Sequence, residues 1–205
     1  ANLQAAVLLL QTLQQQGLLH VVLCPGSRSG PLALAAAGLQ RSGLITLSTA
    51  IDERSAGFHA LGRSSASGVA TAVITTSGTA VANLLPAAVE ADRSSQPLLL
   101  ISADRPLRLK NKGANQTVNQ EAFLTPVCRW CGSGPLDGLN AGLDQELRAL
   151  AHKAWRHLHQ QPGPVHLNIP FEEPLLPDLN QQNAFWSQWN RSEPEAITHT
   201  PELWT

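Results

Sequence analysis

The 205-residue sequence has no long hydrophobic run, few charged side chains and little cysteine. Its longest apolar segments, such as residues 97–101, have the length of a strand, whereas a membrane-spanning helix needs roughly 20 apolar residues. Charged residues make up 14% of the chain and the formal net charge is -1, so neither sign of charge dominates. We therefore expect no membrane span and no nucleic-acid surface, and we expect small molecules or proteins as partners.

The three cysteines, Cys24, Cys128 and Cys131, are too few and odd in number for a disulfide framework in a chain of this length. Residues 1–4 carry no basic segment that leads into an apolar stretch, so the sequence shows no secretory signal. Both features predict a reduced, cytoplasmic protein.

Helical and strand-like patterns alternate along the first 170 residues. Apolar residues at helical spacing predict helices over 3–16, 31–39, 52–63, 79–91 and 144–160. Short apolar runs predict strands over 19–23, 45–48, 69–75, 98–102, 127–132 and 165–169. Continuously apolar strands that alternate with helices indicate a mainly parallel sheet with helices on both faces. The sequence therefore predicts a three-layer, doubly wound α/β domain over residues 1–170.

Residues 171–205 have a different composition, because prolines recur at positions 174, 177, 194 and 201 and no helical or strand period is visible. We expect this segment to be a linker or boundary tail without regular elements. Three of the five tryptophans lie after residue 185, and an exposed indole usually has an apolar surface to cover. The tail is therefore expected to dock on a further domain.

In doubly wound sheets, ligands bind at the carboxyl ends of the strands, so the loops that follow strands hold the candidate site residues. The first such loop, residues 25–30, offers two glycines for close backbone approach and Arg28 for pairing with a carboxylate or phosphate. A plain strand-to-helix turn with a surface arginine explains the loop equally well. The loop matches neither a Walker nor a dinucleotide-binding glycine pattern.

Three further loops carry polar side chains after strands. Asp52-Glu53-Arg54 opens a helix, where acidic residues are common because they interact favourably with the helix dipole. The segment 75–79 is rich in hydroxyls, which either bind an anion or a pyrimidine edge or serve as ordinary helix caps. The segment 103–116 brings a guanidinium and two amides beyond a strand end, and a long polar loop in this position is more often functional than structural.

No other group of residues indicates chemistry. Cys128 and Cys131 have the spacing of half a zinc site or a redox pair, but no second cysteine pair accompanies them, so we interpret them as two thiols on or beside a strand. The histidines at 152, 157, 159 and 166 lack a spacing that would hold a metal on one face, and no metal site is expected in this chain. The Gly-x-Ser-x-Gly motif of hydrolases is also missing.

Five motifs, which follow one another along the chain, carry a family resemblance. They are Cys24-Pro-Gly-Ser-Arg-Ser29, Asp52-Glu-Arg54, Thr76-Ser-Gly-Thr-Ala-Val-Ala-Asn83, Ser102-Ala-Asp-Arg-Pro106 and Gly113-Ala-Asn-Gln116. Together they resemble the 2-succinyl-5-enolpyruvyl-6-hydroxy-3-cyclohexene-1-carboxylate synthases, a family of thiamine-diphosphate-dependent carboligases. The resemblance covers residues 5–176 and implies the thiamine-diphosphate-binding fold, of which this chain represents only the N-terminal, pyrimidine-binding domain.

The resemblance implies a transferase activity. The family decarboxylates 2-oxoglutarate and adds the succinyl semialdehyde unit to isochorismate in a Stetter-like reaction on the route to menaquinone or phylloquinone. It uses thiamine diphosphate with Mg²⁺ or Mn²⁺, which a Gly-Asp-Gly motif in a separate C-terminal domain binds. Because that motif is missing here, this chain alone is expected to be inactive. The active protein is expected to be a homodimer or homotetramer whose sites lie between subunits.

The resemblance also assigns roles to residues of this sequence. The acid that matches Glu53 hydrogen-bonds a pyrimidine ring nitrogen of the cofactor and thereby promotes deprotonation of the thiazolium carbon, so Glu53 is the expected catalytic residue and a cofactor ligand. The expected cofactor side of the site also includes Ser77, Gly78 and Asn83. The expected substrate-binding residues are Ser27, Arg28, Arg105, Asn115 and Gln116, of which the two arginines suit carboxylates.

Two other interpretations stay open. A carboligase of the acetolactate-synthase kind, acting on other 2-oxo acids, would share the glutamate but would not need Arg28, Arg105 and the Asn115-Gln116 pair. A non-catalytic binding or assembly module would fit a chain that has no metal or diphosphate site of its own.

Overall fold

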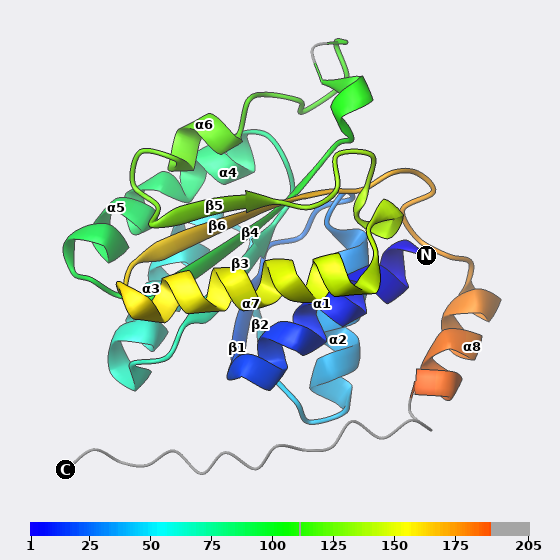
Figure 1. Cartoon of the computed structure of the whole chain (residues 1–205), viewed down its shortest axis with the longest axis horizontal. Coiled ribbons are helices and arrows are strands. Elements are labelled where there is room, and N and C mark those ends of the chain that lie inside the picture. Colours follow the sequence, from blue (N-terminus) through cyan, green and yellow to red (C-terminus); the bar gives the residue numbers. More distant parts are fainter. Residues whose placement is uncertain (111, 190–205) are drawn as a thin grey trace.

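The computed structural model describes residues 1–110 and 112–189, which contain a six-stranded sheet (Figure 1). The strands are β1 (His20–Leu23), β2 (Thr46–Thr49), β3 (Thr71–Thr75), β4 (Leu98–Asp104), β5 (Trp130–Ser133) and β6 (Pro164–Pro170). They lie in the order β2-β1-β3-β4-β6-β5, and every neighbouring pair is parallel. The α/β fold predicted from the sequence is confirmed, and within the described residues the sheet is wholly parallel.

Helices cover both faces of the sheet (Figure 1). One face carries α1 (Asn2–Gln16), α2 (Gly30–Arg41) and α7 (Asp144–Gln160), and the other carries α3 (Glu53–Ser67), α4 (Thr79–Asn83), α5 (Leu85–Arg93) and α6 (Glu121–Leu124). Two short 3-10 turns, η1 (Leu107–Leu109) and η2 (Leu139–Ala141), lie in the loops. None of the helices in residues 1–110 and 112–189 combines the length and the hydropathy that a bilayer-spanning segment needs.

The central strands are buried on both faces, which explains their continuously apolar sequences. In β3, Ala72 and Ile74 pack in the core under α1, α2 and α7, whereas Val73 between them packs in the core under α3 and α5. The same alternation continues in β4, whose seven residues are all buried. The strands are packed between the two cores, which set the positions from which the loops at their carboxyl ends start.

Two elements differ from the prediction between residues 79 and 133. The single helix expected over 79–91 is two helices, α4 and α5, which meet at Leu84. Pro86 explains the break, because it has no N–H to donate to the carbonyl four residues earlier and its ring crowds that turn. The strand expected over 127–132 begins only at Trp130, because the amides of Val127 and Cys128 donate to the carbonyl of Leu124 in a turn after α6.

The segment after residue 170 contains a helix, so the expectation of a tail without regular elements is wrong. α8 spans Leu179–Trp189, and Asp178 caps it by accepting a hydrogen bond from the Gln181 amide at 2.8 Å. Trp186 packs on α2 at Gly38, where a Cβ atom would come within 2.0 Å of the indole. The ring fits there because Gly38 has no side chain. The domain boundary at residue 170 stays a prediction, and Trp204 lies outside the described residues.

Candidate functional site

The carboxyl ends of neighbouring strands bring together three of the expected site residues. Arg28 follows β1, Ser77 follows β3 and Arg105 follows β4, and all three are buried. Nη1 of Arg105 donates to Oγ of Ser77 at 2.5 Å and to the carbonyl oxygen of Gln116 at 3.2 Å. The structure therefore joins Ser77, which was expected on the cofactor side, directly to Arg105 and through Arg105 to Gln116, both of which were expected to bind substrate.

Arg105 is a buried cation that has no carboxylate partner among the described residues. The residue is 9% exposed, and its Nε and Nη2 groups donate no hydrogen bond to any described residue. Burial lowers the pKa of Arg105, and the nearby positive charge of Arg28 lowers it further. The negative charges of Asp104 and Glu173 oppose this lowering, although neither carboxylate forms an ion pair with the Arg105 guanidinium. A guanidinium with open N–H groups in such a place is suited to bind an anionic ligand, because the ligand can accept the hydrogen bonds that the protein does not.

Arg28 lies close to Arg105 but has protein partners. Its Nη1 donates to the carbonyl oxygen of Phe171 and its Nη2 to Oε1 of Glu173, both at 3.0 Å. The Glu173 side chain is 65% exposed, so this ion pair contributes at most about 1 kcal/mol to stability. An incoming carboxylate can therefore replace Glu173 at low cost. Sequence reasoning missed Glu173, because the sole signal was its place just after the last strand.

Two glycines allow these loops to approach one another. A Cβ atom on Gly26 would lie 2.4 Å from Cβ of Thr76, so the loops after β1 and β3 touch there. Gly78 has a φ angle of +82°, which favours glycine, and a Cβ atom on it would lie 3.3 Å from Cβ of Gln116. Gly78 is thus the point at which the hydroxyl-rich turn meets the long polar loop.

Gln120 fixes this contact from inside the domain. The residue is fully buried, and its Oε1 accepts a hydrogen bond from the Gly78 amide at 2.9 Å. Its Nε2 donates to the carbonyl oxygen of Ala103 at 3.0 Å and to Oδ1 of Asn168 at 2.6 Å. Gln120 therefore ties the turn after β3 to strands β4 and β6, a role that its position at the end of a polar loop does not reveal.

Glu53 opens α3 after β2 and is half-buried. Its carboxylate makes no hydrogen bond or ion pair with any described residue, whereas the neighbouring Asp52 caps the helix by accepting from the Ser55 amide at 2.7 Å. The role at a helix start that is common for acidic residues therefore explains Asp52 but does not explain Glu53. Burial and the charge of Glu53 raise the pKa of Cys24 to about 12, which shows that the carboxylate lies near the end of β1.

The remaining expected site residues are exposed. Ser27 and Asn115 lie in the loops after β1 and β4, and Asn83 ends α4. None of the three side chains makes a hydrogen bond with another residue in the described part of the chain. The structure does not bring them into the cluster formed by Ser77, Arg105 and Gln116, and their roles stay predictions.

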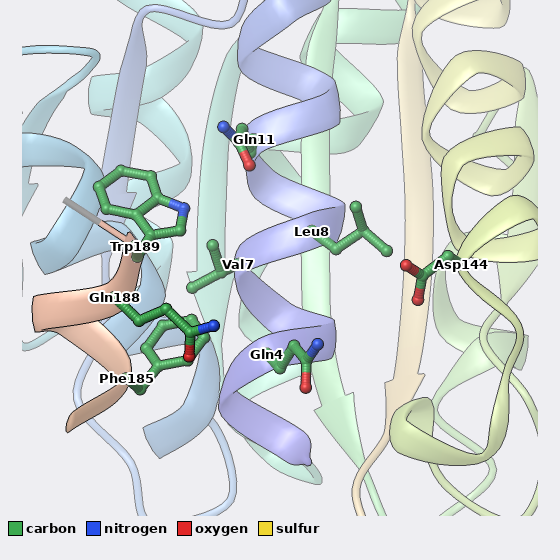
Figure 2. Close-up of a pocket in the computed structure, with 8 residues that line it drawn as sticks. All are labelled: Gln4, Val7, Leu8, Gln11, Asp144, Phe185, Gln188 and Trp189. Atoms are coloured by element: carbon green, nitrogen blue, oxygen red, sulfur yellow. The ribbon is translucent and has the colours of Figure 1, made fainter. Parts of the chain in front are cut away.

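A separate pocket of about 270 Å³ lies between helices and not among these loops (Figure 2). Its lining side chains come from α1, α7 and α8 and are Gln4, Val7, Leu8, Gln11, Asp144, Phe185, Gln188 and Trp189. Asp144 is the single titratable group in this lining, so the pocket offers no pair of groups for acid–base chemistry. Among residues 1–110 and 112–189, no group of three or more His, Cys, Asp or Glu side chains could hold a metal ion.

Comparison with known proteins identifies the family. Residues 3–123 match the family described as thiamine pyrophosphate enzyme, N-terminal TPP binding domain. A 2-succinyl-5-enolpyruvyl-6-hydroxy-3-cyclohexene-1-carboxylate synthase of Synechococcus sp. (strain CC9311) is 91% identical over 195 residues, which are 95% of this chain and 34% of that protein. A protein of the same name from Prochlorococcus marinus (strain MIT 9303) is 62% identical over 185 residues, which are 90% of this chain and 32% of the relative.

The chain thus spans about a third of the length of the curated relatives it matches. These matches confirm the resemblance carried by the five motifs, and the matched residues include the loops after β1, β2, β3 and β4. The chain belongs to the thiamine pyrophosphate enzyme family, in which it corresponds to the N-terminal TPP-binding domain.

Proposed function

We propose that this chain is the pyrimidine-binding domain of a 2-succinyl-5-enolpyruvyl-6-hydroxy-3-cyclohexene-1-carboxylate synthase, a carboligase of menaquinone or phylloquinone biosynthesis. The complete enzyme would decarboxylate 2-oxoglutarate and add the succinyl semialdehyde unit to isochorismate. The names of the relatives support this proposal. The observation that carries it is Arg105, a buried guanidinium with open N–H groups beside a second arginine, because both substrates are dicarboxylates.

The carboxyl edge of the sheet fits the pyrimidine half of thiamine diphosphate. The Glu53 carboxylate has no partner among the described residues, and the buried Oγ1 of Thr75 at the end of β3 also has none. Groups of this kind are usually satisfied by a ligand or water. Bound thiamine diphosphate would supply the nucleophilic carbon for decarboxylation and for carbon–carbon bond formation. We assign Glu53 to share a proton with the pyrimidine ring nitrogen.

Contacts in the structure support our assignments of Ser77, Gly78 and Arg28. Ser77 and Gly78 form the cofactor-side turn, and Ser77 also orients Arg105 by accepting its hydrogen bond. Arg28 would bind a substrate carboxylate by exchanging Glu173 for it. We further propose that Asn83 completes the cofactor side and that the substrate side is completed by Ser27, Asn115 and Gln116.

The diphosphate and its Mg²⁺ or Mn²⁺ would be held outside this chain, since the described residues contain no metal-ligand cluster. The other half of the site would come from a further domain of a partner subunit, which makes a homodimer or homotetramer the active form. We also propose a cytoplasmic location, residues 1–170 as the pyrimidine domain and residues 171–205 as the link to the next domain.

The test measures isochorismate consumption by the full-length protein after its cofactor has been stripped. Consumption is expected only when 2-oxoglutarate, thiamine diphosphate and Mg²⁺ are all added. Arg105→Ala is expected to lose this activity, whereas Arg93→Ala, which removes an 81% exposed guanidinium on α5, should keep it. Full activity without the cofactor would contradict the proposal. Turnover of other 2-oxo acids without isochorismate would instead support a carboligase of the acetolactate-synthase kind.

A further inference from the structure

Cys128 and Cys131 form a pair of neighbouring thiols at the edge of the sheet, apart from the residues assigned above. Cys128 follows the turn after α6, and Cys131 lies on β5, the last strand in the sheet order. The two thiols lie near enough to one another that each changes the acidity of the other. Both are half-buried, whereas the third cysteine, Cys24, is completely buried. A reagent in solution therefore has easier access to Cys128 and Cys131 than to Cys24.

A buried histidine lies beside the pair. Cys131 is in register with His166 on β6, and its thiol interacts with the imidazole ring. His166 is fully buried, and its Nε2 lies 2.7 Å from Oγ of Ser102. Its Nδ1 has no hydrogen-bond partner of standard geometry within the described residues. An imidazole in this position polarises a neighbouring thiol, as in other reactive cysteine sites.

The two thiols differ in acidity. The hydrogen bond from Cys128 and the adjacent His166 lower the pKa of Cys131 to about 5, against the opposing effect of burial. The hydrogen bond to Cys131 and burial raise the pKa of Cys128 above its ordinary value. Cys131 is therefore the more acidic of the two thiols and the one that forms the nucleophilic thiolate first.

We propose that Cys128 and Cys131 are a redox pair that exchanges with small-molecule disulfides such as oxidised glutathione, with Cys131 as the attacking sulfur and Cys128 as the resolving thiol. This inference is independent of the proposed carboligase function. Two neighbouring thiols three residues apart, both partly exposed, suit thiol–disulfide exchange, because the attacking thiol must be accessible and a resolving thiol must be near it.

The exchange has two steps. In the first, the sulfur of Cys131 attacks one sulfur of oxidised glutathione, the glutathione S–S bond breaks and one glutathione thiolate leaves. In the second, Cys128 loses its proton and attacks Sγ of Cys131, which displaces the second glutathione. Two electrons pass from the cysteines to the disulfide, and the two released glutathione sulfurs take up two protons. The products are one Cys128–Cys131 disulfide and two molecules of reduced glutathione.

The first experiment incubates the reduced full-length protein in glutathione buffers of increasing oxidised fraction, traps free thiols with an alkylating agent and maps the peptides by mass spectrometry. The expected product is an intramolecular disulfide between Cys128 and Cys131 that dithiothreitol reverses, while Cys24 stays a free thiol. The variant Cys24→Ser should behave as the unchanged protein does. A natively folded protein that forms no such disulfide in the most oxidising buffer would overturn the proposal.

Single variants separate the two roles. Cys128→Ser should trap a mixed disulfide between glutathione and Cys131. In the reduced unchanged protein, where both thiols are present, alkylation of Cys131 should depend less on pH between about 6 and about 8 than alkylation of Cys128 does, because the pKa of Cys131 is lowered and that of Cys128 is raised. Circular dichroism confirms that each variant is folded. Equal pH profiles for the two thiols, or faster glutathione addition at Cys128, would contradict the assignment.

Discussion

Lys110 holds the start of the loop after β4 through a buried ion pair, and its replacement tests how firmly that loop is fixed. Its Nζ lies 2.7 Å from Oδ2 of Asp104, whose side chain is fully buried, and 3.0 Å from both carboxylate oxygens of Glu121. Removing one partner of a buried pair costs about 3–5 kcal/mol, because the other charge stays buried. Asp104 keeps hydrogen bonds from the Asn168 amide group and the Arg105 backbone. We therefore expect Lys110→Met to lower the free energy of unfolding by about 3 kcal/mol.

The assay is urea unfolding of the 205-residue chain followed by tryptophan fluorescence. The double variant Asp104→Asn/Lys110→Met removes both charges and should recover part of the loss, leaving a deficit of about 1 kcal/mol. Lys112→Met, at an exposed position in the same loop, is the matched control and should change stability by less than about 0.5 kcal/mol. A loss below about 1 kcal/mol for Lys110→Met, or a double variant as unstable as the single one, would refute the reasoning.

Three further outcomes are expected. In the full-length protein, Ser77→Ala removes a hydrogen bond to a charged group worth about 1.5–3 kcal/mol, so steady-state kinetics should show a KM for isochorismate raised about tenfold to 150-fold; an unchanged KM would exclude the orienting role. Gly38→Ala puts a Cβ atom against Trp186 and should cost about 1–3 kcal/mol in urea unfolding, whereas Gly62→Ala in the open part of α3 should gain about 0.5–1 kcal/mol; a stabilised Gly38→Ala would mean that Trp186 does not pack there. The pKa of Cys131 is lowered from 9.0 to about 5 in the folded state, so its thiolate stabilises the fold above the unfolded pKa, and this stabilisation is lost as the pH falls. The difference in unfolding free energy between the unchanged protein and Cys131→Ser should therefore shrink as the pH of the urea titration is lowered towards about 5. A difference that stays constant would count against the lowered pKa.

The sheet was predictable because its strands carry the signal themselves. The residues of β3 and β4 are buried on both faces of the sheet, so successive positions in these strands are mostly apolar and form continuous runs in the sequence. α8 was missed because the prolines around it dominate the local pattern. The cap at Asp178 was its one local signal, and the packing of Trp186 depends on the gap at Gly38, which is distant in sequence.

Several residues of the site could be predicted from the sequence, but the residues that they contact could not. Polar residues after apolar strands marked Arg28, Ser77 and Arg105, because parallel strands place their carboxyl ends at one edge. The partner of Arg28, Glu173, lies 145 positions away, and no local pattern connects the two residues. The burial of Gln120 could not be predicted either, because its side-chain amide is buried by hydrogen bonds to residues on or after three different strands, β3, β4 and β6.

The assignment of Glu53 as the residue that activates the cofactor is tested most directly at the cofactor itself. Proton NMR can measure how fast the C2 proton of the thiazolium ring exchanges with deuterium when thiamine diphosphate is bound to the full-length protein. Positioned acid–base groups typically contribute about 10²–10⁴-fold, so Glu53→Gln should slow this exchange by that factor while calorimetry still detects cofactor binding. An exchange rate unchanged in Glu53→Gln, with the cofactor bound to the same extent, would contradict the account.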